Sequence, residues 1–308
     1  MNRRNPTLGL GFALAGAALF GLNASSTRVL AESGYSASQI VIFRSLANVI
    51  CAGLVLLATN RSAFRVSRRE LPQLFLFGIV GVAVMQWAYT NAVSLLPVGT
   101  ALLFEYTAVL FVPIATQLFF KERHSPVLWV GVIAVLAGLT AISGLSTEPL
   151  DLVGVGFAML ASTTLTLYFI SAERIQRTRD SMSLLFYSML ISSLFWMLVN
   201  PSALASSANP LATISLGGNL NEQHAPAWLL LAWVALAGSF APMLFSYLAL
   251  RSLSATAVGV ASTAETIFAF LFGWLWLAQP VSSAQWLGGI LVVGGIIAAQ
   301  LSRRTTST

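Results

Sequence analysis

Residues 38–70 read SQIVIFRSLANVICAGLVLLATNRSAFRVSRRE, an apolar stretch that runs directly into a strongly basic loop. Four arginines follow the stretch closely: Arg61, Arg65, Arg68 and Arg69. A helix of roughly 20 apolar residues crosses the ~30 Å hydrocarbon core of a bilayer, and it closes its own backbone hydrogen bonds there. Basic residues collect in the loops on the cytoplasmic side of a membrane. The segment is therefore typical of a membrane-spanning helix that ends in the cytoplasm.

Apolar stretches of this kind occur ten times along the 308 residues. The predicted spans are 8–30, 38–59, 73–95, 98–119, 126–144, 152–172, 182–200, 226–250, 254–277 and 284–301. Only 8% of the residues are charged and 57% are hydrophobic, whereas a soluble domain has roughly 25% charged residues. We therefore expect an all-α polytopic membrane protein with ten transmembrane helices.

The basic residues also predict the orientation of the chain in the membrane. Of the 16 Lys and Arg residues, all except Arg28 and Arg44 fall in loops or tails on the side that contains the N-terminus. The opposite loops contain acidic residues instead: Glu32, Glu148, Asp151 and Glu222. The positive-inside rule thus predicts cytoplasmic N- and C-termini in the plasma (inner) membrane. Because the cations behind the net charge of +6 are spread over these loops, we expect the lipid bilayer, and not nucleic acid, as a partner.

An internal duplication divides the sequence into two halves. Trp129-Val130-Gly131 recurs 157 residues later as Trp286-Leu287-Gly288. Matches at the same spacing pair Leu96 with Leu253, Phe111 with Phe268, Leu118 with Leu275, Ser125 with Ser282, Val135 with Val292, and Gly138 with Gly295. Each repeat holds five spans, an odd number, so the second copy must enter the membrane from the opposite side. We predict two inverted five-helix repeats, 1–146 and 147–304, with a cytoplasmic tail at 305–308. In many transporters such repeats enclose a substrate site near the midplane.

The repeated segments resemble the EamA family of the drug/metabolite transporter superfamily. The resemblance covers nearly the whole chain and is strongest in 85–123 and 243–280, each of which ends in a short turn before a Trp-Leu/Val-Gly helix. Leu103-Phe104-Glu105-Tyr106-Thr107 is similar to a stretch of the threonine/homoserine exporter subgroup, and Ala264-Glu265-Thr266 resembles a Glu-Pro motif without its proline. The resemblance implies ten helices and the export of small metabolites.

One feature departs from the family pattern. Glu122-Arg123, after the fourth span, is similar to a Glu-Arg pair that is common in the family. At the equivalent place in the second half the chain has Gln279-Pro280, so any role that this charge has elsewhere is not expected there.

Charged side chains inside the predicted spans are the first candidate site residues, because ionisable groups are costly to bury in a membrane. Glu265 lies near the middle of the ninth span and would bind a substrate amine or carry a coupling proton; alternatively it only forms a hydrogen bond to a neighbouring helix. Glu105 and Arg44 lie at a similar depth, so we expect Arg44 to form a structural ion pair with Glu105. Glu105 is also a candidate substrate-binding group, with adjacent Phe104 and Tyr106 as pocket walls.

Uncharged polar and aromatic residues are the second group of candidates. They are Asn23 in the first span, Gln86, Trp87 and Tyr89 in the third, and Tyr247 in the eighth, which is nearly equivalent to Tyr89 in the duplication. We expect these residues to line a cavity. The alternative is that they form hydrogen bonds between closely packed helices, as polar residues do in membrane bundles.

The pattern as a whole predicts a secondary transporter that exports amino acids or similar small metabolites by alternating access. The sequence has no His-Glu-x-x-His, no Gly-x-Ser-x-Gly and no phosphate-binding Gly-rich loop ending in Lys, so we expect no enzyme, cofactor or metal. One alternative is an exporter of hydrophobic cations or drugs. Another, of a different class, is a membrane-embedded enzyme or a non-transporting partner protein. The sequence leaves the oligomeric state open.

Overall fold

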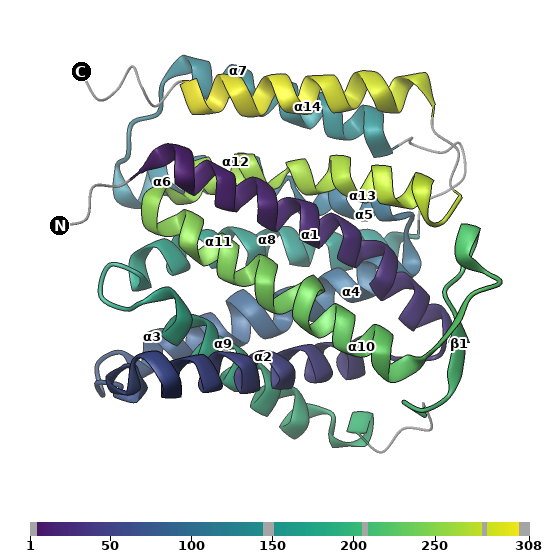
Figure 1. The fold of residues 1–308 in the computed structure, drawn as a ribbon. Coiled ribbons are helices and arrows are strands. Elements are labelled where there is room, and N and C mark those ends of the chain that lie inside the picture. The colour runs from purple at the N-terminus through teal and green to yellow at the C-terminus, as the bar shows by residue number, and fades with distance from the viewer. Residues whose placement is uncertain (1–4, 144–150, 205–208, 279–281, 302–308) are drawn as a thin grey trace.

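The computed structural model describes residues 5–143, 151–204, 209–278 and 282–301 (Figure 1). This part of the chain contains ten helices that are long and apolar enough to cross a membrane. They are Pro6–Glu32, Ala37–Thr59, Leu71–Leu95, Val98–Phe120, Pro126–Ser143, Leu152–Ile175, Ser181–Val199, Ala227–Ser252, Ala255–Leu275 and Ser283–Leu301. Each overlaps a predicted span, which confirms the predicted fold class. The predicted repeat boundary at 146–147 and the tail at 305–308 lie outside the described residues.

Six spans are single helices and four are composite. The single helices are α1 (Pro6–Glu32), α2 (Ala37–Thr59), α7 (Pro126–Ser143), α8 (Leu152–Ile175), α9 (Ser181–Val199) and α14 (Ser283–Leu301). The third span consists of α3 (Leu71–Leu76), the π-helical segment η2 (Phe77–Val84) and α4 (Met85–Leu95), and the eighth of α10 (Ala227–Ala235), the π-helical η5 (Leu236–Phe240) and α11 (Ala241–Ser252). The fourth span is divided into α5 (Val98–Glu105) and α6 (Ala108–Phe120), and the ninth into α12 (Ala255–Ser262) and α13 (Ala264–Leu275).

Short irregular elements connect some of the spans. They are the 3₁₀ turns η1 (Arg61–Phe64), η3 (Pro201–Leu204) and η4 (Gly218–Leu220), and an antiparallel hairpin of β1 (Thr213–Ser215) and β2 (His224–Pro226). The hairpin is the one departure from the predicted all-α class among the described residues. It lies between the seventh and eighth spans.

Polar residues between the apolar stretches determine where several helices begin. Ser36 and Gln39 form a capping box at the start of α2, in which the Gln39 N–H donates to Ser36 Oγ at 3.3 Å and the Ser36 N–H donates to Gln39 Oε1 at 2.8 Å. Asp180 accepts from the Ser183 N–H at 2.9 Å at the start of α9. Such caps satisfy backbone donors that the first helical turn leaves free.

Irregular backbone recurs at positions that are 157 residues apart in the sequence. Lys121 and Ala278 both have a left-handed backbone with φ of 56°, a conformation that residues other than glycine rarely adopt. Leu96 and Leu253 end α4 and α11 with φ of −117° and −121°. The π-helical segments η2 and η5 also overlap at this spacing. These coincidences are compatible with the predicted duplication.

The pair α7 and α14 shows the same relation in its packing. The two helices form a separate layer at one edge of the bundle (Figure 1). A Cβ atom on Gly131 would lie 2.7 Å from the carbonyl oxygen of Gly295, and one on Gly138 would lie 2.6 Å from that of Gly288. In the duplication Gly131 corresponds to Gly288 and Gly138 to Gly295. Gly131 thus contacts the counterpart of Gly138, and Gly138 contacts the counterpart of Gly131. A two-fold axis between the halves requires such reciprocal contacts, so the packing is compatible with an inverted repeat.

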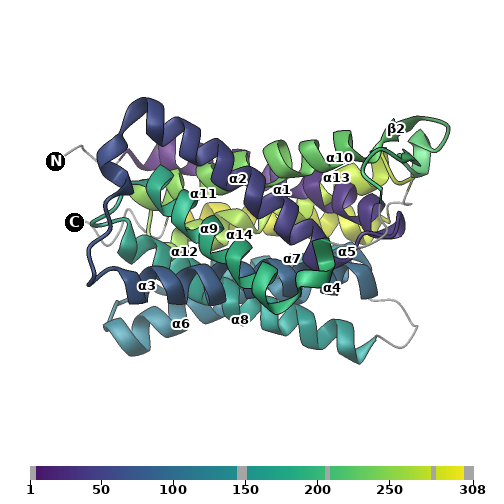
Figure 2. The ribbon, with the colours of Figure 1, turned by 90° about the horizontal axis from the view of Figure 1, so that it is seen from below.

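The outside of the bundle is apolar. Large hydrophobic side chains such as Leu54, Leu118, Leu198 and Ile290 are more than half exposed. A soluble protein rarely exposes an apolar surface of this extent, so these faces fit contact with lipid. The first turn of α1 and the last turn of α14 lie at the same end of the bundle, and the β1–β2 hairpin lies at the other (Figures 1 and 2).

Candidate functional site

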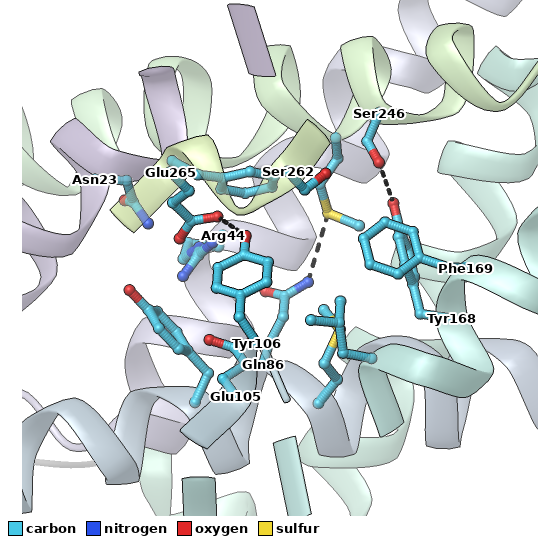
Figure 3. Close-up of a pocket in the computed structure, with 15 residues that line it drawn as sticks. Asn23, Arg44, Gln86, Glu105, Tyr106, Tyr168, Phe169, Ser246, Ser262 and Glu265 are labelled. Atoms are coloured by element: carbon cyan, nitrogen blue, oxygen red, sulfur yellow. Dashed lines mark hydrogen bonds between the residues drawn. The ribbon is translucent and has the colours of Figure 1, made fainter. Parts of the chain in front are cut away.

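Both halves of the chain contribute to one internal cavity. Its free volume is about 70 Å³, enough for a few water molecules. The lining residues are Phe20 and Asn23 from α1, Arg44 from α2, Met85, Gln86 and Tyr89 from α4, Glu105 from α5, Tyr106 directly after α5, Leu165, Tyr168 and Phe169 from α8, Met243 and Ser246 from α11, Ser262 from α12, and Glu265 from α13. Figure 3 shows these side chains converging from several helices.

A hydrogen bond between the two halves lies at the centre of this cavity. The Tyr106 hydroxyl donates to Oε2 of Glu265 at 2.5 Å (Figure 3). Both residues lie at helix breaks, since Tyr106 follows the last residue of α5 and Glu265 is in the first turn of α13. In a continuous helix, adjacent side chains point about 100° apart. At the end of α5 the neighbours Glu105 and Tyr106 both line the cavity, as do the adjacent pairs Met85–Gln86 and Tyr168–Phe169.

Arg44 is the third charged residue of the cavity, and the expected ion pair with Glu105 is not formed. No nitrogen of the Arg44 guanidinium lies within 4.0 Å of a carboxylate oxygen of Glu105 or Glu265. Its Nη2 donates to the carbonyl oxygen of Gly238 at 3.5 Å, and its Nε and Nη1 have no hydrogen-bond partner. The sequence locates both residues at a similar depth, but depth along a helix does not determine which way a side chain points.

The carbonyl that accepts from Arg44 lies one turn before a proline. Pro242 has no N–H for the carbonyl group four residues earlier, and that residue is Gly238 in η5. A Cβ atom on Gly238 would overlap the side chain of Asn23. Glycine at this position therefore lets α1 approach η5 and brings Asn23 to the cavity wall.

Three of the five polar and aromatic candidates line the cavity: Asn23, Gln86 and Tyr89. Gln86 Nε2 lies 3.7 Å from Met243 Sδ, whereas Gln86 Oε1 and the Tyr89 hydroxyl have no hydrogen-bond partner. Buried polar atoms in proteins are usually paired. Gln86 Oε1, the Tyr89 hydroxyl and Nε and Nη1 of Arg44 therefore give the cavity hydrogen-bond donors and acceptors that have no partner in the protein.

Trp87 and Tyr247, which the sequence also suggested, are not among the residues that line this cavity. Trp87 packs against Trp196 and Phe157, with ring centroids 5.3 and 5.1 Å away, on another face of α4. Tyr247 is fully buried behind Tyr168 at a ring distance of 5.7 Å. The repeat counterpart of Tyr89 is Ser246 rather than Tyr247, and it is Ser246 that lines the cavity. An offset of one residue turns a helical side chain by about 100°.

The duplication itself contained a signal for some of the cavity residues that sequence reasoning missed. The counterparts of Gln86, Tyr89 and Glu105, 157 residues later, are Met243, Ser246 and Ser262. All three counterparts line the cavity. Tyr168 and Phe169, on α8, had no comparable signal, because aromatic residues are frequent throughout the apolar spans.

The sequence as a whole can be compared with known proteins. Residues 7–144 and 152–299 each match the EamA-like transporter family. The chain belongs to this family. Membership confirms the family that the sequence resembles, whereas likeness to the threonine/homoserine exporter subgroup stays a prediction.

Relatives of this EamA-like chain are similar over most of its length. An uncharacterized transporter, YdfC, of Bacillus subtilis (strain 168) is 22% identical over 85% of this chain and 81% of its own length. The pseudopaline exporter CntI of Pseudomonas aeruginosa (strain UCBPP-PA14) is 24% identical over 89% of each chain. An uncharacterized transporter of Archaeoglobus fulgidus is 24% identical over 82% of this chain and 84% of its own. The family and these relatives identify the chain as a multi-pass membrane transporter and not an enzyme.

The fold also occurs in a solved structure. A protein of known crystal structure superposes with a TM-score of 0.76 over 99% of both chains, at 19% sequence identity. At this identity the likeness extends to the arrangement of the helices alone. The same arrangement of helices thus occurs at low sequence identity.

Proposed function

We propose that this EamA-like chain is a secondary transporter of the plasma membrane that exports amino acids or similar small metabolites by alternating access. The observation that carries the proposal is one cavity that contains Glu105, Glu265 and Arg44. Ionisable groups buried at membrane depth usually mark a path for substrate or ions. A solute with an amine would bind to the carboxyl groups, and a proton would bind to Glu265 in the absence of the amine.

The arrangement of the helices supports the alternating-access mechanism. Glu265 lies at the middle of the span Ala255–Leu275, where substrate sites lie in transporters built from inverted repeats. Its partner Tyr106 comes from the other half of the chain. A rocking motion of one half against the other would break this hydrogen bond and open the cavity toward one side. Its free volume of about 70 Å³ lies well below that of typical ligand pockets, so loading of an amino acid would require such a motion.

The test is efflux from proteoliposomes loaded with labelled amino acids, with and without an imposed pH gradient. We expect Glu265→Gln to reduce the efflux rate at least tenfold, because the amide neither takes up a proton nor attracts an amine. Glu32→Gln is the matched control, since Glu32 is exposed at the end of α1 and pairs only with Arg28 there. Wild-type rates in Glu265→Gln would remove Glu265 from the mechanism. A proton gradient that has no effect on wild-type efflux would favour uniport.

A second candidate is the export of hydrophobic cations. It is favoured by the aromatic rings of Phe20, Tyr106, Tyr168 and Phe169 in the cavity, since aromatic faces attract cations. Arg44 weighs against it, because the guanidinium repels a cationic solute. Efflux of tetraphenylphosphonium from the same proteoliposomes, without efflux of amino acids, would establish this alternative.

A further inference from the structure

We propose that Arg44 binds the carboxylate of the transported solute, so that the cavity selects zwitterions and not cations. The proposal rests on the proposed transport function and specifies the substrate class of its site. It also assigns to Arg44 a role in specificity, where the sequence predicted a structural ion pair.

The guanidinium of Arg44 is buried without an anion. The residue is 3% exposed and lies in the wall of the cavity (Figure 3). Its single hydrogen bond among the described residues is long, at 3.5 Å to the carbonyl oxygen of Gly238, and Nε and Nη1 have no acceptor. A buried charge without a partner is strongly unfavourable. The arrangement therefore calls for an anion from outside the protein.

Neither carboxyl group of the cavity forms an ion pair with the Arg44 guanidinium. The Glu265 carboxyl accepts from the Tyr106 hydroxyl, and Glu105 forms no ion pair in the described part of the chain. Both carboxyls lie more than 4.0 Å from the guanidinium nitrogens. The positive and negative groups of the cavity thus form no direct ion pair with each other.

Arg28 shows how an arginine of a spanning helix behaves without a binding role. It lies one turn from the end of α1, is partly exposed, and forms an ion pair of 2.9 Å with Glu32 one turn further on. Arg44 has neither the exposure nor the neighbouring carboxylate. Its position is explained by a ligand and not by a stable local pair.

The chemistry of the groups indicates which ligand fits. The planar guanidinium donates two parallel hydrogen bonds to a carboxylate, and its fork matches that shape. Glu105 offers a free carboxyl to an ammonium group on the same solute. A solute with only a negative charge would meet the two glutamates, and one with only a positive charge would meet Arg44. A molecule with both groups satisfies all three residues.

Ligand-induced thermal stabilisation of the purified protein in detergent tests the proposal. The probes are L-threonine, L-leucine and L-phenylalanine, their carboxamides, which lack the carboxylate, and their N-acetyl derivatives, which lack the ammonium group. For each amino acid that binds, we expect the affinity of the free form to be at least tenfold higher than that of its carboxamide and of its N-acetyl derivative. This comparison uses the wild-type protein and does not depend on the folding of a variant.

Substitution of Arg44 then separates its role in binding from a role in folding. Arg44→Gln should weaken binding of the free acids at least tenfold and bring their affinity close to that of the carboxamides. Arg44→Lys, which keeps the charge but not the fork, should bind the acids with intermediate affinity. Arg28→Gln is the control and should bind like the wild type, because Arg28 lies outside the cavity.

Each outcome bears on a different part of the argument. Two results would contradict the proposed role of Arg44: wild-type protein that binds carboxamides as tightly as free acids, or an Arg44→Gln variant that still prefers the acids. Neither result would contradict amino-acid transport. If no amino acid binds and tetraphenylphosphonium does, both the role of Arg44 and the amino-acid substrate class are wrong. If neither class of probe binds, the proposal for Arg44 is likewise overturned.

Discussion

The hydrogen bond from Tyr106 to Glu265 joins the two halves of the chain at the cavity. It is short, at 2.5 Å, and both residues are buried. Loss of one partner of a buried hydrogen bond costs about 1–3 kcal/mol, since the remaining group is left unsatisfied. We expect Tyr106→Phe to lower the free energy of unfolding in detergent by that amount, and to change the pH dependence of efflux through Glu265.

A tyrosine outside the cavity is the matched control for this prediction. Tyr35 is buried between α1 and α2, and its hydroxyl has no hydrogen-bond partner. Tyr35→Phe should therefore be as stable as the wild type or slightly more stable. Equal stability of the Tyr106→Phe variant and the wild type would show that the bond contributes nothing to the fold.

At the residue scale, the sequence predicted which polar groups lie at the cavity better than it predicted their contacts. Glu105, Glu265, Gln86, Tyr89 and Asn23 were recognisable because a polar group in an apolar span needs a reason to be there. The contacts of these residues were not predictable in the same way. They depend on the rotation of each helix about its axis. An error of one residue in the alignment changes the direction of a side chain by about 100°.

At the scale of elements, the ten spans followed from apolar length, whereas the breaks inside four of them did not. A π-helical segment has one extra residue in its turn and changes the rotation of everything that follows it. The segment η2 precedes α4, which contains Gln86, Trp87 and Tyr89. A uniform helical period therefore could not decide which of these three faces the cavity. Hydropathy does not encode such a segment, although Pro242 lies just after the second one.

The antiparallel pair of α7 and α14 provides a prediction at this scale. Small residues let membrane helices approach closely, and a Cβ atom at Gly138 would lie 2.6 Å from a backbone oxygen and 2.8 Å from a backbone nitrogen of α14. Backbone atoms cannot move aside as a flexible side chain does. We expect Gly138→Val to separate the helices and to lower stability by roughly 1–3 kcal/mol or more, measured as thermal unfolding in detergent.

A second glycine in the same layer tests whether the close contact is the cause. A Cβ atom at Gly289 would meet no atom within 4 Å. Gly289→Val should therefore unfold at nearly the temperature of the wild type. Equal losses in both variants would point to a general effect of valine in these helices and would contradict the close-packing argument.

At the scale of the whole molecule, composition and the distribution of charge were sufficient for the fold class, and the duplication contained a signal for some of the cavity residues. Residues that are 157 positions apart contact each other directly where Gln86 meets Met243. A contact between equivalent positions is expected on a two-fold axis that relates the halves. What the sequence could not supply is the free space between the halves, because it depends on the packing of both at once.

The relation between the halves has a consequence that can be measured in cells. If the second repeat is inverted, Lys121 and its counterpart Ala278 lie on opposite sides of the membrane, although they share the same exposed left-handed turn. Single cysteines at these two positions, in a chain with Cys51→Ser, would be treated with a membrane-impermeant thiol reagent. With cytoplasmic termini, we expect labelling of Ala278→Cys on intact cells and of Lys121→Cys only after permeabilisation. Labelling of both from the same side would contradict the inversion, and with it the alternating-access mechanism that depends on two opposed halves around one cavity.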